Sequence, residues 1–167
     1  IVTPVSLGTA TITYMLGTGC ISTKTINVIG SVPAITGDST VCALNTILLS
    51  NTSTGGTWSS GTPSVATIDA FGLVTGAAAG TTSITYSLGG GCETNKTITV
   101  NPLPAAITPG TPNICVGSIV TLTSLSPGGS WMSTDPSVAT VDASGTVTGI
   151  NVGSAIVSYT LPTGCAT

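Results

Sequence analysis

The sequence predicts an all-β chain that repeats one module, and three observations lead to this fold class. The stretch from Trp58 to Gly76, WSSGTPSVATIDAFGLVTG, recurs 73 residues later, from Trp131 to Gly149, as WMSTDPSVATVDASGTVTG. A fixed period of this length is typical of tandem repeat proteins. Thr occurs 33 times and Gly 22 times; Thr suits pleated strands, whereas Gly marks turns. Apolar and polar residues also alternate along several short runs, as they do in half-buried strands.

The first copy of the module is incomplete and covers residues 1–30. Its Ile12, Tyr14 and Cys20 recur 72 residues later, in the second half of the next copy. Nothing that matches the Trp-containing half precedes them. We therefore expect residues 1–30 to form the tail of a module.

Residues 31–103 form the one complete copy, and we predict seven strands in it. The first strand covers Val32–Ile35 and, after Gly37, continues at Thr40–Cys42. The other six are Thr46–Ser50, the segment around Trp58, Val65–Asp69, Leu73–Thr75, Thr82–Leu88 and Glu93–Asn101. Alternation supports the last two strands, because Ile84 and Tyr86 alternate with Thr85 and Ser87, and Ile98 and Val100 alternate with Thr97 and Thr99. The tripeptides Ala70-Phe71-Gly72 and Gly89-Gly90-Gly91 supply turns between neighbouring strands.

The third copy, residues 104–167, follows a short proline-rich junction, Asn101-Pro102-Leu103-Pro104. Proline cannot donate to a strand ladder, so we expect the junction to be stiff and without strand pairing. This copy repeats the module as far as Cys165 and lacks the last strand. Both ends of the sequence fall inside modules, and we expect it to be part of a longer array.

Composition narrows the functional classes. Only 4% of the residues are charged, and the formal net charge is −3, so the chain has no basic patch for nucleic acid. No apolar run approaches the roughly 20 residues of a membrane helix, and we predict no membrane insertion in this segment. A surface so poor in charge is either kept soluble by hydroxyl groups or covered by sister chains or glycans.

Catalytic chemistry has few candidates in this sequence. There is no histidine, which excludes Ser-His-Asp and Cys-His arrangements. The sequence contains no C-x-x-C pair, the usual sign of a zinc site. Residues Gly76–Gly80 lack the lysine of a phosphate-binding loop. Asp69 and Asp142 precede turns and are interpreted as turn residues, with calcium as the less favoured alternative. We predict no enzyme, no cofactor and no metal.

The repeated stretch resembles the bacterial immunoglobulin-like domains of group 2. The pattern consists of W-x-S, then P-S-V-A-T-[IV]-D, then G-x-V-T-G, then a glycine before an alternating I-T-Y strand. In the complete copy the residues that carry it are Trp58, Ser60, Pro63–Thr67, Asp69, Gly72, Val74–Gly76 and Gly80. In the next copy they are Trp131, Ser133, Val138–Thr140, Asp142, Gly145, Val147–Gly149 and Gly153.

The resemblance implies tandem immunoglobulin-like seven-strand β-sandwiches in large secreted or surface proteins such as adhesins. The cysteines depart from the commonest form of the family and are similar to the variety found in long repetitive bacterial surface proteins. In such a sandwich Trp58 and Trp131 fill the core, together with Tyr86 and Tyr159. An exposed aromatic platform for sugars is the alternative reading of the two tryptophans.

Five cysteines, Cys20, Cys42, Cys92, Cys115 and Cys165, indicate an oxidising, extracellular setting. Pairing within modules would join Cys42 to Cys92 and Cys115 to Cys165. In an up-and-down count of strands, however, Cys42 and Cys92 lie at opposite ends of the sandwich, too far apart for a disulfide. In a head-to-tail string Cys42 lies beside Cys165, and we prefer this pair. Interchain bonds or free thiols are the third possibility.

The function predicted from these observations is structural. The chain is interpreted as a stalk or fibre-forming repeat of a long bacterial extracellular surface protein. We expect it to bear load and to associate laterally with other copies of the same chain. The alternative is an adhesion module that binds glycans or cell-surface proteins through loops such as Asn51–Thr57. Loops of similar length in the two copies favour the stalk, because a receptor-binding module would carry a distinctive insertion.

Overall fold

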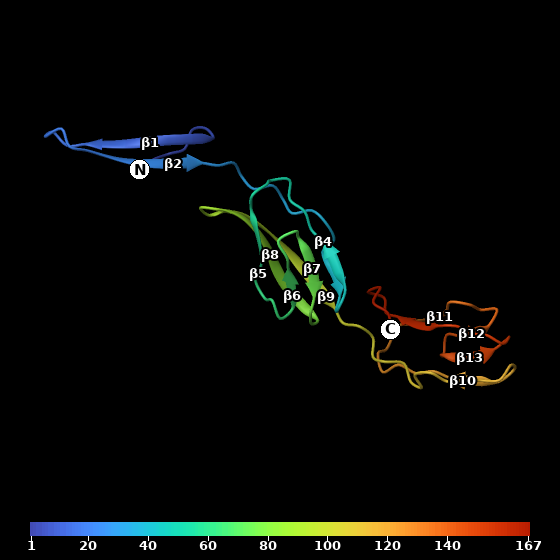
Figure 1. Ribbon diagram of the computed structural model, residues 1–167. Helices are drawn as coiled ribbons and strands as arrows, with labels where there is room; N and C mark the ends of the chain where they lie inside the picture. The colour runs from blue at the N-terminus through green and yellow to red at the C-terminus, as the bar shows by residue number, and fades with distance from the viewer.

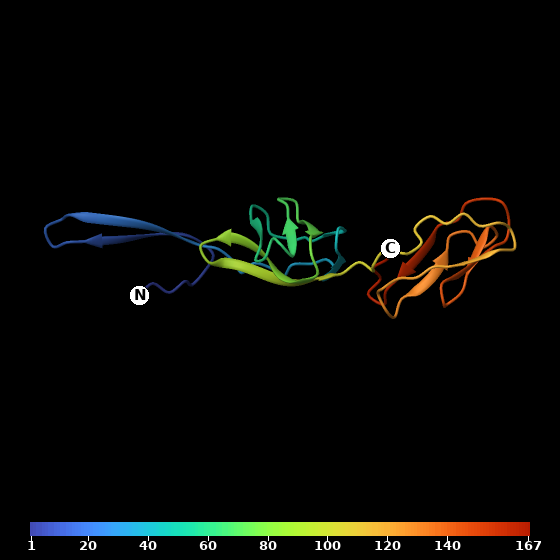
Figure 2. The same ribbon diagram turned by 90° about the horizontal axis from the view of Figure 1, so that it is seen from below.

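The computed structural model describes all 167 residues, which form strands, turns and loops without a helix. The predicted all-β class is therefore confirmed. Three units follow one another along an elongated molecule (Figures 1 and 2). They are the N-terminal hairpin, made of β1 (Gly8–Met15) and β2 (Ile21–Val28), the middle module, whose strands lie between Thr40 and Asn101, and the third module, whose strands lie between Ile119 and Thr160. No part of the chain is a helix long and apolar enough to cross a membrane.

The middle module is a sandwich of seven strands in two sheets, as predicted. The strands are β3 (Thr40–Cys42), β4 (Thr46–Leu48), β5 (Thr57–Ser60), β6 (Ala66–Ile68), β7 (Leu73–Gly76), β8 (Gly80–Gly89) and β9 (Cys92–Asn101). One sheet has the order β3-β9-β8-β5, and the other has the order β4-β7-β6. The long strands β8 and β9 pair over nearly their whole length, so they form the backbone of the larger sheet.

The start of the middle module differs from the prediction in two respects. The predicted strand Val32–Ile35 does not form; the only pairing there is an isolated bridge between Thr36 and Ser50. The chain then crosses to the other sheet, where β3 runs parallel to β9. The up-and-down count of strands was therefore wrong. Gly37 permits the crossing: its φ is 112°, and a Cβ there would lie 2.5 Å from the Leu48 carbonyl oxygen.

Nine buried residues from both sheets form the core of the middle module. They are Ile35, Val41, Leu49, Ala66, Val74, Ile84, Tyr86, Ile98 and Val100. Trp58 is partly buried and packs against this cluster. The inward residues of β8 and β9 follow period two, which is why alternation located these strands in the sequence.

The third module repeats this plan except for the counterparts of β3 and β9, neither of which forms a strand. Its strands are β10 (Ile119–Thr121), β11 (Ser130–Ser133), β12 (Ala139–Val141), β13 (Thr146–Gly149) and β14 (Val157–Thr160). They form the sheets β10-β13-β12 and β11-β14. After β14 the chain turns back, and Ala166 forms an isolated bridge with Thr160.

A cavity of about 570 Å³ lies in the third module and is lined mainly by apolar side chains. Ile114, Leu122, Val147 and Val157 are among them, and their counterparts in the middle module are buried core residues. There the same space is closed by β9, whose Ile98 and Val100 are almost completely buried. The cavity thus lies at the position that the core strand β9 fills in the middle module.

Candidate functional site

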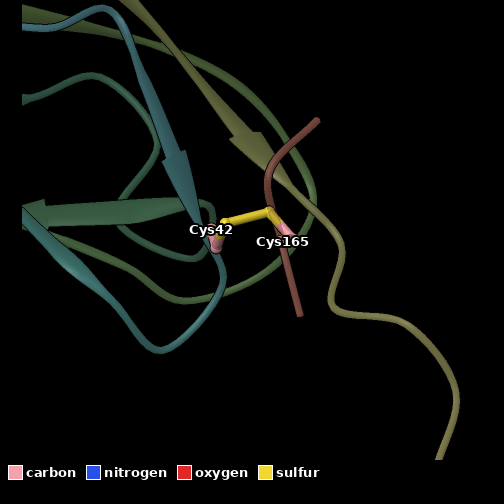
Figure 3. The surroundings of a disulfide bond; sticks show 2 residues. All are labelled: Cys42 and Cys165. Carbon is pink, nitrogen blue, oxygen red and sulfur yellow. A yellow bond between two sulfur atoms is a disulfide. The ribbon is translucent and has the colours of Figure 1, made fainter. Parts of the chain in front are cut away.

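The junction between the middle and third modules is the most distinctive site in the structure, because a disulfide crosses it. Cys42 and Cys165 are bonded, although they lie 123 residues apart in the sequence. Their Cα atoms are 5.6 Å apart, and Figure 3 shows the bond joining β3 to the segment after β14. This is the pair preferred from the sequence. Cys20, Cys92 and Cys115 have free thiols.

Cys42 is held in a turn that we call the corner turn, residues 42–45. The Asn45 amide donates to the Cys42 carbonyl at 3.0 Å, and the Leu44 amide donates to the Gly76 carbonyl at 2.8 Å. Leu44 is the one residue other than glycine with a positive φ, 67°. Gly76 is required beside it, since a Cβ there would lie 2.9 Å from the Cys42 carbonyl oxygen. These contacts fix the direction in which the Cys42 side chain leaves the module.

Cys165 lies at the end of a second rigid turn, which we call the hairpin tip, residues 161–165. The Leu161 amide donates to the Cys165 carbonyl, and the Gly164 amide donates to the Leu161 carbonyl, both at 2.9 Å. Cys165 is only 1% exposed. Thr163 of the tip lines a hollow of about 200 Å³ together with Asn45 and Asn101 of the middle module. The tip therefore packs against the end of the middle module beside the disulfide.

The covalent link between the two modules is short. Asn101 still belongs to β9, and Pro104 is already buried. The Ala105 amide donates to the Ser126 hydroxyl at 2.8 Å, which ties the chain to the third module. The free link thus consists of Pro102 and Leu103, and proline limits its backbone freedom. The two modules are therefore joined by two covalent connections, this link and the Cys42–Cys165 disulfide.

A bond within the middle module is excluded by the strand register. Cys42 pairs with Asn101 at the end of β9, whereas Cys92 begins the same strand. The nine residue steps between Cys92 and Asn101 correspond to about 30 Å, and bridged Cα atoms lie about 4.4–6.8 Å apart. Cys42 and Cys92 therefore lie too far apart for a disulfide, as predicted. The up-and-down strand order from which this was predicted is wrong, because β3 runs parallel to β9.

The aromatic residues singled out in the sequence form one pair in each module. The ring centroids of Trp58 and Tyr86 lie 4.7 Å apart, and those of Trp131 and Tyr159 lie 4.7 Å apart. Tyr86 is 5% exposed and Tyr159 is 6% exposed. Each tryptophan is in strand register with its tyrosine, Trp58 on β5 with Tyr86 on β8 and Trp131 on β11 with Tyr159 on β14. The tyrosines are buried, and the tryptophans, predicted to fill the core, are partly buried.

The aspartates at the repeated turns bind backbone amides. The Asp69 carboxylate accepts from the Phe71 and Leu73 amides at 2.8 and 2.9 Å. Asp142 accepts from the Ser144 and Thr146 amides at the same distances and also from the Ser144 hydroxyl. This hydroxyl is the main cause that lowers the pKa of Asp142. In the same module the Ser137 hydroxyl lowers the pKa of Asp135. Nowhere do three or more metal-binding side chains gather.

An exposed apolar patch on the middle module was not foreseen from the sequence. Leu48 and Leu73 face each other in the register of β4 and β7 and are 63% and 39% exposed. Phe71, at the adjacent turn, is 84% exposed. The third module has Thr121, Thr146 and Ser144 at these positions. Comparing the two copies for sites where one is apolar and the other polar could have found this patch.

Two families match this sequence. Residues 22–100 match the bacterial Ig-like domain (group 2), and residues 120–163 match the immunoglobulin-like domain of intimin. Ice-binding protein 1 of Shewanella frigidimarina (strain NCIMB 400) is 33% identical over 115 residues. The match covers 61% of this chain and 13% of that protein.

One solved structure with a TM-score above 0.5 has a similar fold. The C-terminal 282-residue fragment of intimin, solved in complex with the intimin-binding domain of the translocated intimin receptor, has a TM-score of 0.51. The intimin fragment is 16% identical in sequence, and the match covers 82% of this chain and 62% of the fragment. Domains 4 and 5 of the S-layer protein SbsC have a TM-score of 0.39 and 19% identity over 78% of this chain and 92% of theirs.

Proposed function

We propose that this chain, whose residues 22–100 belong to the bacterial Ig-like domain (group 2) family, is a load-bearing segment of a long bacterial extracellular stalk or fibre. The observation that carries the proposal is the bond between Cys42 and Cys165, which crosses a module boundary. A disulfide of this kind also favours an extracellular location, because such bonds persist in oxidising compartments.

The cross-boundary bond has a mechanical consequence. On the chain-entropy model, closing a loop of 123 residues stabilises the folded chain by about 5 kcal/mol. More important for a stalk, two covalent connections restrict bending at the junction, whereas Pro102 and Leu103 alone would permit it. The role of the module is then to set length and stiffness, and no single side chain performs chemistry.

Lateral association of such stalks is part of the proposal. Charged residues make up 4% of the sequence, and the net charge is −3, so electrostatic repulsion between copies is weak. Rows of threonine also face each other in the N-terminal hairpin, where Thr11 pairs with Thr25 and Thr13 with Thr23. Neutral hydroxyl surfaces of this kind can approach one another without desolvating charge.

Peptide mapping and small-angle X-ray scattering test the stapled stalk. We expect non-reducing mapping to recover a Cys42–Cys165 peptide and scattering to show a rod of one narrow length distribution. The double variant Cys42→Ser/Cys165→Ser should broaden that distribution, since the junction can then bend. Cys92→Ser is the matched control and should leave the profile unchanged. Recovery of a Cys42–Cys92 peptide, or equal profiles for all three proteins, would contradict the proposal.

A second candidate function, adhesion, is favoured by the exposed patch of Leu48, Phe71 and Leu73. Exposed apolar patches mark protein-binding sites, and this patch is absent from the third module. The triple variant Leu48→Thr/Phe71→Ser/Leu73→Thr gives the middle module the third module's residues. If the chain is an adhesion module, this variant should lose binding to immobilised cell-surface proteins or glycans while retaining the disulfide. Unchanged binding would leave the stalk as the sole candidate.

A further inference from the structure

The two sulfur atoms of the junction disulfide belong to residues in unequal surroundings. Cys165 is only 1% exposed, whereas Cys42 is half-buried at the end of β3. The hollow of about 200 Å³ beside the bond is lined by Cys42 of the corner turn and by Thr163 of the hairpin tip, but not by Cys165. A molecule that enters the hollow therefore meets the disulfide from the Cys42 side.

The walls of this hollow suit a small uncharged ligand. Three threonines and two asparagines supply its polar lining, and no charged residue contributes to it. Asn45 and Asn101 are held by their backbones: the Asn45 amide donates to the Cys42 carbonyl at 3.0 Å, and the Asn101 carbonyl accepts from the Ala43 amide at 2.9 Å. Their side-chain amides can hydrogen-bond a hydroxyl group of the ligand. A space of this volume holds a few water molecules or one small organic thiol.

The chemistry of thiol–disulfide exchange gives this asymmetry a consequence. A thiolate attacks one sulfur of a disulfide and the other sulfur leaves as a thiolate, so the sulfur that is reached decides the products. Entry through the hollow makes Cys42 the attacked sulfur and Cys165 the leaving group. The Cys165 thiolate then forms in a position almost closed to water, where a charge is costly. Reclosure of the bond is therefore favoured while the junction stays assembled.

We propose that the hollow is the entry site for a small uncharged thiol, which attacks Cys42 and forms a mixed disulfide there, while Cys165 becomes the free thiol. The inference rests on the proposed function, because it concerns the bond that staples the two modules. It adds a means of control to the stalk. A small thiol releases the junction at one defined sulfur, and removal of the thiol lets the staple form again.

The reaction consists of two exchange steps. In the first, the small thiolate forms a bond to the Cys42 sulfur, the Cys42–Cys165 bond breaks, and the Cys165 thiolate takes a proton from water. In the second, another small thiolate attacks the sulfur of the bound small molecule and releases the Cys42 thiolate, which is also protonated. Two small thiols are thus oxidised to one disulfide while the protein disulfide is reduced. Reclosure reverses the first step, since the Cys165 thiolate attacks the Cys42 sulfur and expels the small thiolate.

Peptide mapping after brief exposure to 2-mercaptoethanol tests which sulfur is attacked. Iodoacetamide first blocks the free cysteines of the full chain, Cys20, Cys92 and Cys115. After the exposure, N-ethylmaleimide at mildly acidic pH labels each thiol that the exchange has released. At early times we expect 2-mercaptoethanol on Cys42 and N-ethylmaleimide on Cys165, in about tenfold excess over the opposite arrangement. Equal amounts, an excess on Cys165 or no product at Cys42 would overturn the inference.

A bulky side chain in the hollow tests the route of entry. Thr46 is exposed and lines the hollow, so Thr46→Trp should fill part of the space and slow reduction by 2-mercaptoethanol severalfold. Thr67→Trp is the matched control. Thr46 and Thr67 both pair with Thr75 in the smaller sheet, and Thr67 is exposed but lies outside the hollow. Circular dichroism checks that both variants keep their strands. Equal reduction rates for the two variants would show that the thiol does not enter through the hollow.

The outcomes separate this inference from the proposed function. Recovery of the Cys42–Cys165 peptide before the thiol is added, followed by attack at Cys165, overturns the entry site and leaves the stapled stalk intact. Absence of that peptide before any thiol is added contradicts the proposed function itself.

Discussion

The middle and third modules each depend on one buried tyrosine whose hydroxyl group ties a loop to the sheet that contains the tyrosine. The Tyr86 hydroxyl donates to the Ser53 carbonyl at 2.7 Å and accepts from the Gly56 amide at 2.9 Å. Tyr159 makes the same two bonds with Ser126 and Gly129 at 2.7 and 2.8 Å. A Cβ at Gly56 would collide with the Tyr86 ring. The tyrosine, the glycine and the loop therefore form one unit at the residue scale.

Tyr86→Phe is expected to destabilise the middle module by about 1–3 kcal/mol, the cost of leaving buried polar groups without partners. The ring still fills the core, so the loss measures the hydroxyl alone. Tyr14→Phe is the matched control, since Tyr14 holds the same repeat position in the N-terminal hairpin and is 67% exposed. Chemical denaturation of both variants, followed by tryptophan fluorescence, measures the effect; equal stability of the two variants would contradict it.

The stability of the third module is expected to decline as the pH falls below about 4. The pKa values of Asp135 and Asp142 are lowered in the folded chain, so each carboxylate favours folding above the unfolded value of about 3.9. That contribution is lost as the pH falls through the lowered folded value. Thermal unfolding between pH 5 and about pH 2 measures the decline.

Asp142→Asn should weaken this pH dependence, because the residue then no longer titrates. Asp38→Asn is the control, as Asp38 lies on an exposed loop and makes no hydrogen bond through its side chain. If both variants keep the full slope of the unfolding temperature against pH, the turn carboxylates are not its source.

At the scale of elements, alternation and turn residues located most strands, but not the way the chain enters the middle module. Period two marks β8 and β9 because one face is buried and the other is not. It could not reveal that β3 joins the opposite sheet, since parallel pairing with β9 depends on residues some 60 positions away. The repeat and the head-to-tail order of the modules likewise predicted that Cys42 pairs with Cys165. The rigid turns around these two cysteines could not be predicted, because they depend on hydrogen bonds that no local sequence pattern encodes.

Extending the third module by the sequence of Asn95–Asn101 after Thr167 is expected to stabilise it. Thr167 corresponds to Thr94, so the added strand continues in the register of β9 and places Ile98 and Val100 in the apolar cavity. Burial of each side chain contributes about 1.5–3 kcal/mol. The thermal midpoint of the third module, followed by near-ultraviolet circular dichroism, should rise.

A matched extension with threonine at both apolar positions provides the control for this experiment. It has the same length and the same backbone hydrogen bonds but buries less apolar surface. We expect it to raise the midpoint by less. If the two extensions act alike, the cavity is not the site that the strand occupies.

At the scale of the whole molecule, the disulfide changes the path along which tension travels. A pull on the two ends reaches Cys42 from one side and Cys165 from the other, and the bond carries it directly between them. Residues 43–164, which include nearly all of both modules, lie within the closed loop. Their folding then contributes shape and spacing, while the covalent bond bears the load.

Single-molecule pulling on the chain by its ends should therefore release little length under oxidising conditions. Only residues 1–41 and the last two residues can extend, because the loop between Cys42 and Cys165 is bypassed. Reduction should add about 400 Å of extended chain, at about 3.3–3.6 Å for each of the residues in the loop. Cys42→Ser should give the long extension without reductant, and Cys92→Ser should behave as the unmodified chain. A full-length extension of the oxidised protein would show that tension does not pass through this bond, and the stalk would then have to resist force through its sandwiches alone.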